Sequence, residues 1–136
     1  MIIPINIKIM NNKLKMLYVD DEPLNLYIFE FNFGKKFNVI TGISGFEGLT
    51  QLKENPEIKI VVSDMSMPVM NGLEFIRKAK GEYPDISFFI LTGYDITEDI
   101  QKALDEGLIN RYFRKPLNAK EISLSIEETF SYKILK

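Results

Sequence analysis

Short apolar runs and amphipathic helical patterns alternate along most of this chain, and this alternation constrains its fold more than any other feature. Five runs rich in β-branched, aromatic and other apolar residues predict strands at 14–19, 37–43, 58–62, 86–91 and 109–113. Helical patterns follow them at 23–34, 44–54, 71–82, 95–107 and 118–130. Strict alternation of this kind is typical of a parallel sheet whose strands are joined by right-handed helical crossovers. The sequence therefore predicts an α/β fold in three layers, with helices on both faces of one sheet.

Four of the predicted helices begin with a capping signature, in which Asn, Asp or Ser is followed three residues later by Glu. The pairs are Ser44/Glu47, Asn71/Glu74, Asp95/Glu98 and Asn118/Glu121. Such a pair satisfies backbone N–H groups that the first turn of a helix leaves without partners. Each pair therefore predicts a helix N-terminus at its first residue.

The chain has the length and composition of a single globular domain, with 136 residues, of which 46% are hydrophobic and 26% charged. We expect the domain at 14–132, an N-terminal extension at 1–13 and a short tail at 133–136. In the extension, Ile alternates with polar residues or proline from Ile3 to Ile9, a pattern of an edge strand or a partner-binding arm. A flexible extension is the simpler interpretation.

The charge of the chain and its missing residue types exclude several classes of function. A net charge of -2 gives no electrostatic reason to expect binding of nucleic acid, which normally requires a basic stripe. No apolar run approaches the roughly 18 residues of a membrane span, and the N-terminus lacks the pattern of a signal peptide. The chain has no cysteine and no histidine, which excludes thiol and histidine chemistry within it. The absence of cysteine also agrees with a cytoplasmic location, which we expect.

Polar residues whose side chains could bind a ligand or react lie where the predicted strands end. Asp20 and Asp21 follow the first strand, Asp64 follows the third, Thr92 follows the fourth and Lys115 follows the fifth. Each residue alone has a simpler explanation, as a helix cap, a turn residue or a surface charge. Because the carboxyl ends of parallel strands meet at one edge of a sheet, we expect them together around one crevice.

This set of residues supports phosphoryl transfer to a carboxylate. Clustered carboxylates repel one another, so Asp20, Asp21 and Asp64 favour a divalent cation, and oxygen ligands favour Mg²⁺. An aspartate is ionised at neutral pH and needs no general base to act as a nucleophile. The cation and Lys115 would offset repulsion from the incoming phosphoryl group, and Thr92 would hydrogen-bond one of its oxygens. The product would be an aspartyl phosphate on Asp64.

Four motifs, YVDDEP, VVSDMSMPVMNGLEF, LTGY and RYFRKPL, occur in this order along the chain. With them, the chain from about Leu14 to Phe130 resembles the receiver domain of two-component response regulators. The resemblance implies a doubly wound, flavodoxin/CheY-like sheet of five parallel strands in the order 2-1-3-4-5. It also implies a signalling module of a phosphorelay rather than an enzyme, with Mg²⁺ as cofactor. The expected phosphoryl donor is a partner histidine kinase or histidine phosphotransfer protein.

The resemblance assigns the phosphoacceptor and the metal ligands. Asp64 matches the aspartate that takes the phosphoryl group. Asp20 and Asp21 match the acidic pair, with Asp21 the more direct ligand of the metal. Ser66 matches the position whose backbone carbonyl completes the metal site together with Asp64.

The resemblance also assigns the residues that respond to phosphorylation. Thr92 and Lys115 match the hydroxyl and the lysine that contact the phosphoryl group, and a cis peptide is implied between Lys115 and Pro116. Thr92 and Tyr112 match the pair that switches conformation and changes the surface seen by an output partner or a fused effector domain. A homodimer on activation is common in such domains and is a further expectation.

The first predicted helix carries more apolar residues than one buried face requires. They are Leu24, Leu26, Tyr27, Ile28, Phe29, Phe31 and Phe33. In the family that the chain resembles, this helix docks the kinase or the phosphotransfer protein. A thicker core covered by the Ile-rich N-terminal segment explains the surplus equally well, and both interpretations stay open.

Three other functions fit an α/β chain of this kind. A phosphatase with an aspartate nucleophile would place Asp-x-Asp after the first strand, where this chain has Asp20-Asp21-Glu22. A binding module of the same fold would never carry phosphate. A flavodoxin-like FMN carrier would need a hydroxyl-rich phosphate loop after the first strand, which this sequence lacks.

Overall fold

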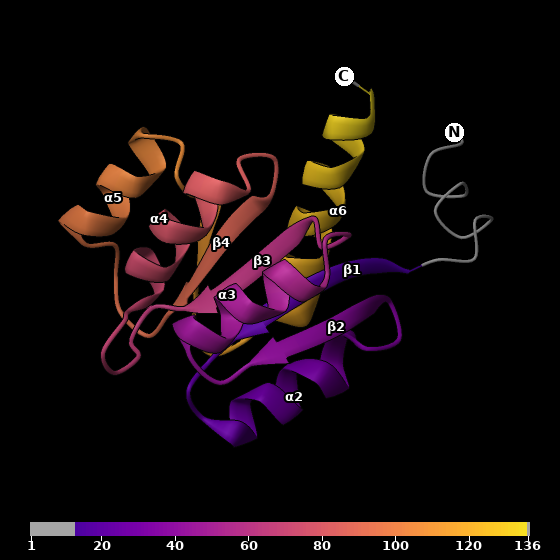
Figure 1. The fold of residues 1–136 in the computed structure, drawn as a ribbon, viewed down its shortest axis with the longest axis horizontal. Helices are drawn as coiled ribbons and strands as arrows, with labels where there is room; N and C mark the ends of the chain where they lie inside the picture. The colour runs from indigo at the N-terminus through magenta and orange to yellow at the C-terminus, as the bar shows by residue number, and fades with distance from the viewer. Residues whose placement is uncertain (1–12, 136) are drawn as a thin grey trace.

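Five parallel strands form one sheet in the order β2-β1-β3-β4-β5, which confirms the predicted α/β class and strand order (Figure 1). The computed structural model describes residues 13–135, with side chains up to residue 131. The strands are β1 (Leu14–Val19), β2 (Phe37–Gly42), β3 (Ile60–Asp64), β4 (Ser87–Thr92) and β5 (Arg111–Arg114). The helices are α2 (Pro23–Phe33), α3 (Gly45–Glu54), α4 (Gly72–Glu82), α5 (Glu98–Asp105) and α6 (Ala119–Leu135).

The sheet is buried on both faces because successive strand side chains point to opposite sides. On β1, Leu17 and Val19 pack in a core with residues of α3, α4 and α5. Met16 and Tyr18, the alternate residues, pack in a second core with residues of α2 and α6. The fold therefore has three layers, with three helices on one face and two on the other.

The register of the parallel ladders brings the ends of four strands to one edge. Val19 lies opposite Ser63, and Asp64 lies opposite Leu91. Thr92 in turn lies opposite Arg114, the last residue of β5. Residues that are 22 to 44 positions apart in the chain therefore meet at this carboxyl edge, where the loops to α2, α4, α5 and α6 begin.

Three of the four predicted helix caps are confirmed. The side chain of Ser44 accepts a hydrogen bond from the N–H of Glu47 at 3.0 Å, and Asn118 accepts one from Glu121 at 3.0 Å. Asn71 and Glu74 form a complete capping box, with hydrogen bonds of 2.9 and 2.8 Å. These contacts fix where α3, α4 and α6 leave the carboxyl edge.

The fourth predicted cap, Asp95/Glu98, is wrong. Helix α5 begins at Glu98 and its N-cap is Thr97, whose hydroxyl accepts a hydrogen bond from the N–H of Ile100 at 3.2 Å. The carboxylate of Asp95 instead pairs with the guanidinium of Arg114 on β5 at 2.9 Å. A partner from a distant strand therefore takes the side chain that the local pattern assigned to the helix.

Other predicted boundaries move by a few residues. Strand β3 runs from Ile60 to Asp64 and includes the aspartate expected after it, and β5 begins at Arg111 rather than at residue 109. Helix α6 continues to Leu135, beyond the predicted end at residue 130. The expected N-terminal extension lies almost wholly outside the described residues. Within the described range, no helix is both long and apolar enough to cross a membrane.

Candidate functional site

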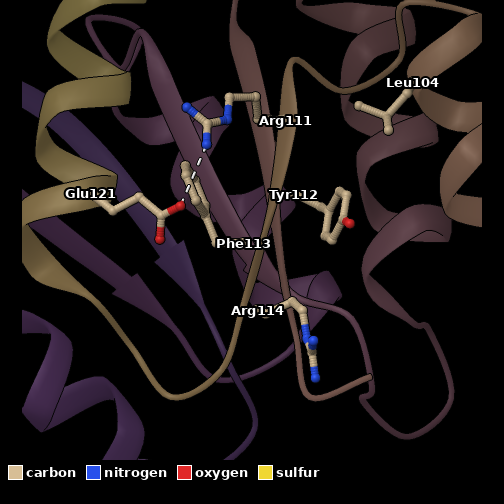
Figure 2. Close-up of a pocket in the computed structure, with 6 residues that line it drawn as sticks. All are labelled: Leu104, Arg111, Tyr112, Phe113, Arg114 and Glu121. Carbon is tan, nitrogen blue, oxygen red and sulfur yellow. Dashed lines mark hydrogen bonds and ion pairs between the residues drawn. The ribbon is translucent and has the colours of Figure 1, made fainter. Parts of the chain in front are cut away.

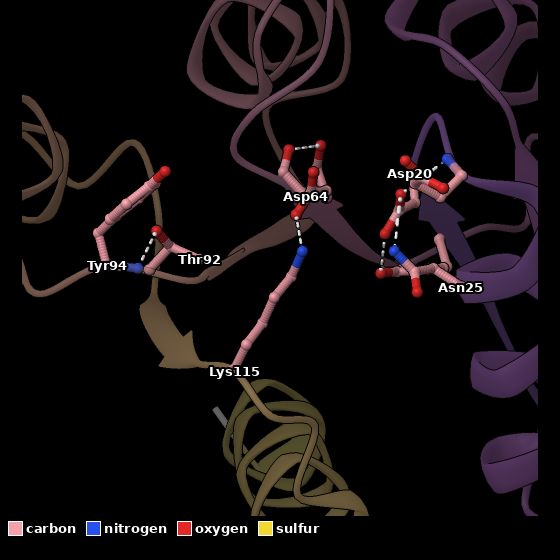
Figure 3. A network of polar contacts seen from close by, with 9 residues as sticks. Asp20, Asn25, Asp64, Thr92, Tyr94 and Lys115 are labelled. Atoms are coloured by element: carbon pink, nitrogen blue, oxygen red, sulfur yellow. Dashed lines mark hydrogen bonds and ion pairs between the residues drawn. The ribbon is translucent and has the colours of Figure 1, made fainter.

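An ion pair between a buried carboxylate and a partly exposed lysine marks the carboxyl edge of the sheet. Asp64, the last residue of β3, is only 4% exposed, and its Oδ1 lies 2.7 Å from the Nζ of Lys115. Figure 3 shows the lysine side chain extending from the end of β5 to Asp64, with Thr92 and Tyr94 on one side and Asp20 and Asn25 on the other. The peptide bond between Lys115 and Pro116 is cis, as the family resemblance implied.

Three carboxylates converge beside this ion pair. Asp20, Asp21 and Asp64 each offer an oxygen atom, and these atoms lie within 4.8 Å of one another. Oxygen atoms so placed suit a hard cation such as Mg²⁺, which binds through few carboxylates and keeps several waters. The donor set therefore fits the cofactor expected from the sequence.

Asp20 is the most enclosed member of the cluster, with a side chain that is fully buried. Its Oδ2 accepts a hydrogen bond from the Tyr18 hydroxyl at 2.6 Å. Its Oδ1 accepts one from the N–H of Glu22 at 3.0 Å and a longer one from the Asn25 amide at 3.4 Å. Burial, with the hydrogen bond to Asp20 and the nearby negative charges, raises the pKa of Tyr18 far above its ordinary value. The hydroxyl therefore stays protonated and acts as a donor.

The sequence analysis missed Tyr18 and Asn25. A signal for Tyr18 was present, because residues two apart on a strand point to the same face. Tyr18 and Asp20 have this spacing at the end of β1. For Asn25, in the first turn of α2, the sequence holds no comparable signal, since its contact depends on where the helix starts.

The electrostatics of Asp64 reflect its burial. Burial raises the pKa of the carboxyl group most, and the charges of Asp20 and Asp21 raise it further. The hydrogen bond from Lys115 works in the opposite direction without cancelling the rise. For Lys115, burial lowers the pKa, but the contact with Asp64 outweighs burial and leaves the pKa above its ordinary value. The lysine therefore stays charged beside a carboxylate that is costly to ionise.

Thr92 lies at the same edge, as expected, and is buried. Its Oγ1 accepts a hydrogen bond from the N–H of Tyr94 at 3.2 Å, and its carbonyl accepts one from the N–H of Lys115 at 2.8 Å. The backbone of the β4 end and that of the lysine are thus joined directly. A change in the position of the Thr92 backbone would therefore also displace the backbone of Lys115.

Gly72 allows α4 to begin close to the site. A Cβ atom at this position would collide with the carbonyl oxygen of Asp64. The N–H of Gly72 donates to the carbonyl of Met65 at 2.8 Å, which closes the loop after β3. Glycine is needed here for close approach of two backbone segments.

Two predicted residues lie apart from the ion pair. Ser66 is exposed in the loop after β3, and the role of its carbonyl stays a prediction. Tyr112 on β5 is half-buried and lines a pocket of about 410 Å³, together with Leu104, Arg111 and Glu121 (Figure 2). Its ring points toward Leu104 in that view, on the side of β5 that faces α5. The switching role of Tyr112 likewise stays a prediction.

Comparison with known proteins agrees with this geometry. The family model described as the response regulator receiver domain matches residues 16–127, and the chain belongs to this family. Over 119 residues it is 28% identical to a chemotaxis protein CheY homolog of Campylobacter jejuni, covering 85% of this chain and 91% of that protein. A solved receiver domain protein from Clostridium thermocellum has a TM-score of 0.83 and 33% identity, covering 90% of this chain and 98% of that one.

One longer relative matches this chain over only a small part of its own length. The chain is 34% identical over 90 residues to a cyclic di-GMP phosphodiesterase of Thermotoga maritima. The alignment covers 66% of this chain but only 23% of the phosphodiesterase. The chain thus corresponds to a receiver module of two-component signalling, which in some relatives is one part of a larger protein.

Proposed function

We propose that this chain is a phospho-accepting receiver in which Asp64 takes a phosphoryl group from a partner histidine kinase or histidine phosphotransfer protein. The observation that carries the proposal is the contact of 2.7 Å between Lys115 Nζ and Asp64 Oδ1, beside the acidic cluster. A buried carboxylate with a fixed cation beside it can receive a phosphoryl group whose negative charge that cation offsets.

In the transfer step, a carboxylate oxygen of Asp64 forms a bond to the phosphorus atom. The bond between phosphorus and the donor's imidazole nitrogen breaks, and its electron pair stays on that nitrogen. Lys115 donates a hydrogen bond to the phosphoryl oxygens as the charge moves onto Asp64, and the Thr92 hydroxyl donates another. Asp20, Asp21, Asp64 and the Ser66 carbonyl would hold Mg²⁺, which supplies further positive charge when bound.

The signal leaves through the β4–β5 side of the domain. Contact of the Thr92 hydroxyl with the phosphoryl group moves the end of β4, and Tyr112 on β5 follows. The surface around Tyr112 then binds an output partner, an effector domain of the same protein or a second copy of the chain. The phosphoryl donors of such relays act in the cytoplasm, and we place the chain there.

The proposal is tested by the intact mass of the protein after incubation with acetyl phosphate and Mg²⁺. We expect one added phosphoryl group that needs Mg²⁺ and is absent from Asp64→Ala. Asp105→Ala is the matched control, because Asp105 lies at the end of α5, outside the acidic cluster. This control is expected to gain phosphate like the wild type.

An adduct that persists in Asp64→Ala would place the acceptor elsewhere. No adduct on folded wild-type protein with Mg²⁺ present would favour a binding module that never carries phosphate.

A further inference from the structure

The buried hydroxyl group of Tyr18 donates a hydrogen bond to Asp20, one member of the acidic pair. Tyr18 lies on β1 two residues before Asp20 and is 2% exposed, and its hydroxyl donates to Asp20 Oδ2 at 2.6 Å. Water has no access to this contact, so no solvent molecule can replace the hydroxyl without a change in packing. The contact is also short, as expected for a hydrogen bond to an ionised oxygen.

The protein donors divide the acidic pair into two kinds of carboxylate. Asp20 accepts from Tyr18, from the N–H of Glu22 and from Asn25, which occupies three of the roughly four lone-pair directions of a carboxylate. Among the described residues, no side chain or backbone group donates to the carboxylate of Asp21, which is partly exposed. Asp21 is therefore free to contact a cation directly, whereas Asp20 has one direction left.

The orientation of the Tyr18 ring is fixed by the core between the sheet and α2. The ring stacks on Phe29 with centroids 3.8 Å apart and planes 5° apart. Phe29 in turn packs on Phe33 at 4.3 Å, and both phenylalanines are buried. Because the ring cannot turn away, the direction of its hydroxyl is set by packing.

We propose that Tyr18 is a positioning residue of the metal site. Its hydroxyl fixes the rotation of the Asp20 carboxylate so that the remaining lone pair points toward the cation shared with Asp21 and Asp64. This inference rests on the proposed Mg²⁺-dependent function. Groups that orient a metal ligand typically change metal affinity by about 10- to 100-fold when removed.

The test is the Mg²⁺ affinity of Tyr18→Phe, measured by following the backbone amide chemical shifts of Asp20, Asp21 and Asp64 during titration with MgCl₂. We expect an affinity about tenfold weaker than that of the wild type, since the ring and its stacking on Phe29 are kept and only the hydroxyl is lost. Tyr27→Phe is the matched control, because Tyr27 is an exposed tyrosine of α2, and its affinity is expected to be unchanged.

A double-variant cycle separates positioning from a general effect on the fold. If Tyr18 acts through Asp20, then Tyr18→Phe changes the affinity less than twofold when Asp20→Asn is already present. Urea unfolding with EDTA and with Mg²⁺ gives a second measurement. A purely structural role would lower both midpoints equally, whereas positioning lowers the stabilisation that Mg²⁺ adds.

Two results would overturn the inference and are distinguishable. Wild-type and Tyr18→Phe proteins that bind Mg²⁺ equally would refute the role of Tyr18 and leave the proposed function intact. A folded wild-type protein that binds no Mg²⁺ would refute this inference together with the metal-dependent part of the proposed function.

Discussion

At the scale of single residues, Asp64 carries a negative charge in a buried position where few positive charges stabilise it. Its side chain is almost fully buried, and two further carboxylates, those of Asp20 and Asp21, each place an oxygen within 4.8 Å of one of its own. Lys115 is the one cation paired with it in the described part of the chain. Acidic groups held in this way destabilise the folded state and are typical of functional sites.

We therefore expect Asp64→Asn to stabilise the protein at neutral pH without Mg²⁺, by about 1–2 kcal/mol. The pKa of Asp64 is raised in the folded state, so folding favours its protonated form and ionisation at higher pH lowers stability. The gain from Asp64→Asn is full above the raised pKa, shrinks as the pH falls through it, and vanishes below about 3.9, the ordinary value. Urea unfolding in EDTA over this pH range measures it.

Asp105→Asn serves as the control for this measurement. Asp105 is exposed, and among the described residues its side chain hydrogen-bonds only with that of Gln101 one turn before it, so we expect a change under about 0.5 kcal/mol at every pH. A loss of stability in Asp64→Asn at neutral pH would contradict the expectation and would mean that the Lys115 contact outweighs the burial of the charge.

At the scale of elements, α3 lies close to the sheet and to α4 because one of its residues has no side chain. A Cβ atom on Gly48 would lie 2.8 Å from the Phe75 ring and 3.0 Å from Val19 Cγ2. Phe75 and Val19 are fully buried and have no room to move away. The glycine therefore sets the distance between α3, β1 and α4.

Gly48→Ala is expected to destabilise the protein by about 1–3 kcal/mol, because overpacking outweighs the better helix propensity of alanine. Gly81→Ala in α4 is the matched control, since nothing lies within 4 Å of its added Cβ. This control is expected to stabilise by about 0.5–1 kcal/mol. Urea unfolding followed by circular dichroism measures both. Equal stabilisation by the two variants would show that α3 packs less closely than the structure indicates.

At the scale of the whole molecule, α2 carries an apolar stripe that the rest of the described residues leaves exposed. Leu24, Tyr27, Ile28 and Phe31 are 40–77% exposed and have the spacing of one helix face. Their neighbours Phe29 and Phe33 point into the core. The surplus of apolar residues predicted from the sequence therefore lies on one exposed helix face within the described residues.

We expect this stripe to bind the phosphoryl donor protein. The donor is selected from purified histidine kinases as one that phosphorylates the wild type. With this phosphohistidine protein, Phe31→Ser should be phosphorylated about tenfold more slowly than the wild type. Phosphorylation by acetyl phosphate should not change, because Phe31 lies outside the acidic cluster. Phe46→Ser is the matched control, since Phe46 is also exposed but belongs to α3, on the other face of the sheet.

The stability of Phe31→Ser distinguishes the two interpretations of the stripe. An exposed side chain changes stability by less than about 0.5 kcal/mol when replaced. A loss above 1 kcal/mol would indicate that another part of the chain covers Phe31, as the alternative of a covering N-terminal segment requires.

Local chemistry in the sequence determined most of the elements and which polar residues meet at the carboxyl edge. Buried strands, the caps at Ser44, Asn71 and Asn118, and the order of the elements follow from periodicity and hydrogen bonding over a few residues. The alternation of strands and helices then left few topologies, so Asp20, Asp64 and Lys115 could be expected at one edge.

Only the tertiary structure decided which partner each of these side chains takes. Asp95 pairs with Arg114 rather than capping α5, and Asp20 is held by a tyrosine whose ring is fixed by Phe29 of another element. The Asp95–Arg114 and Tyr18–Phe29 contacts join separate elements, and their distances are set by the packing of side chains across the fold. A pattern read over a few neighbouring residues contains no information on such distances.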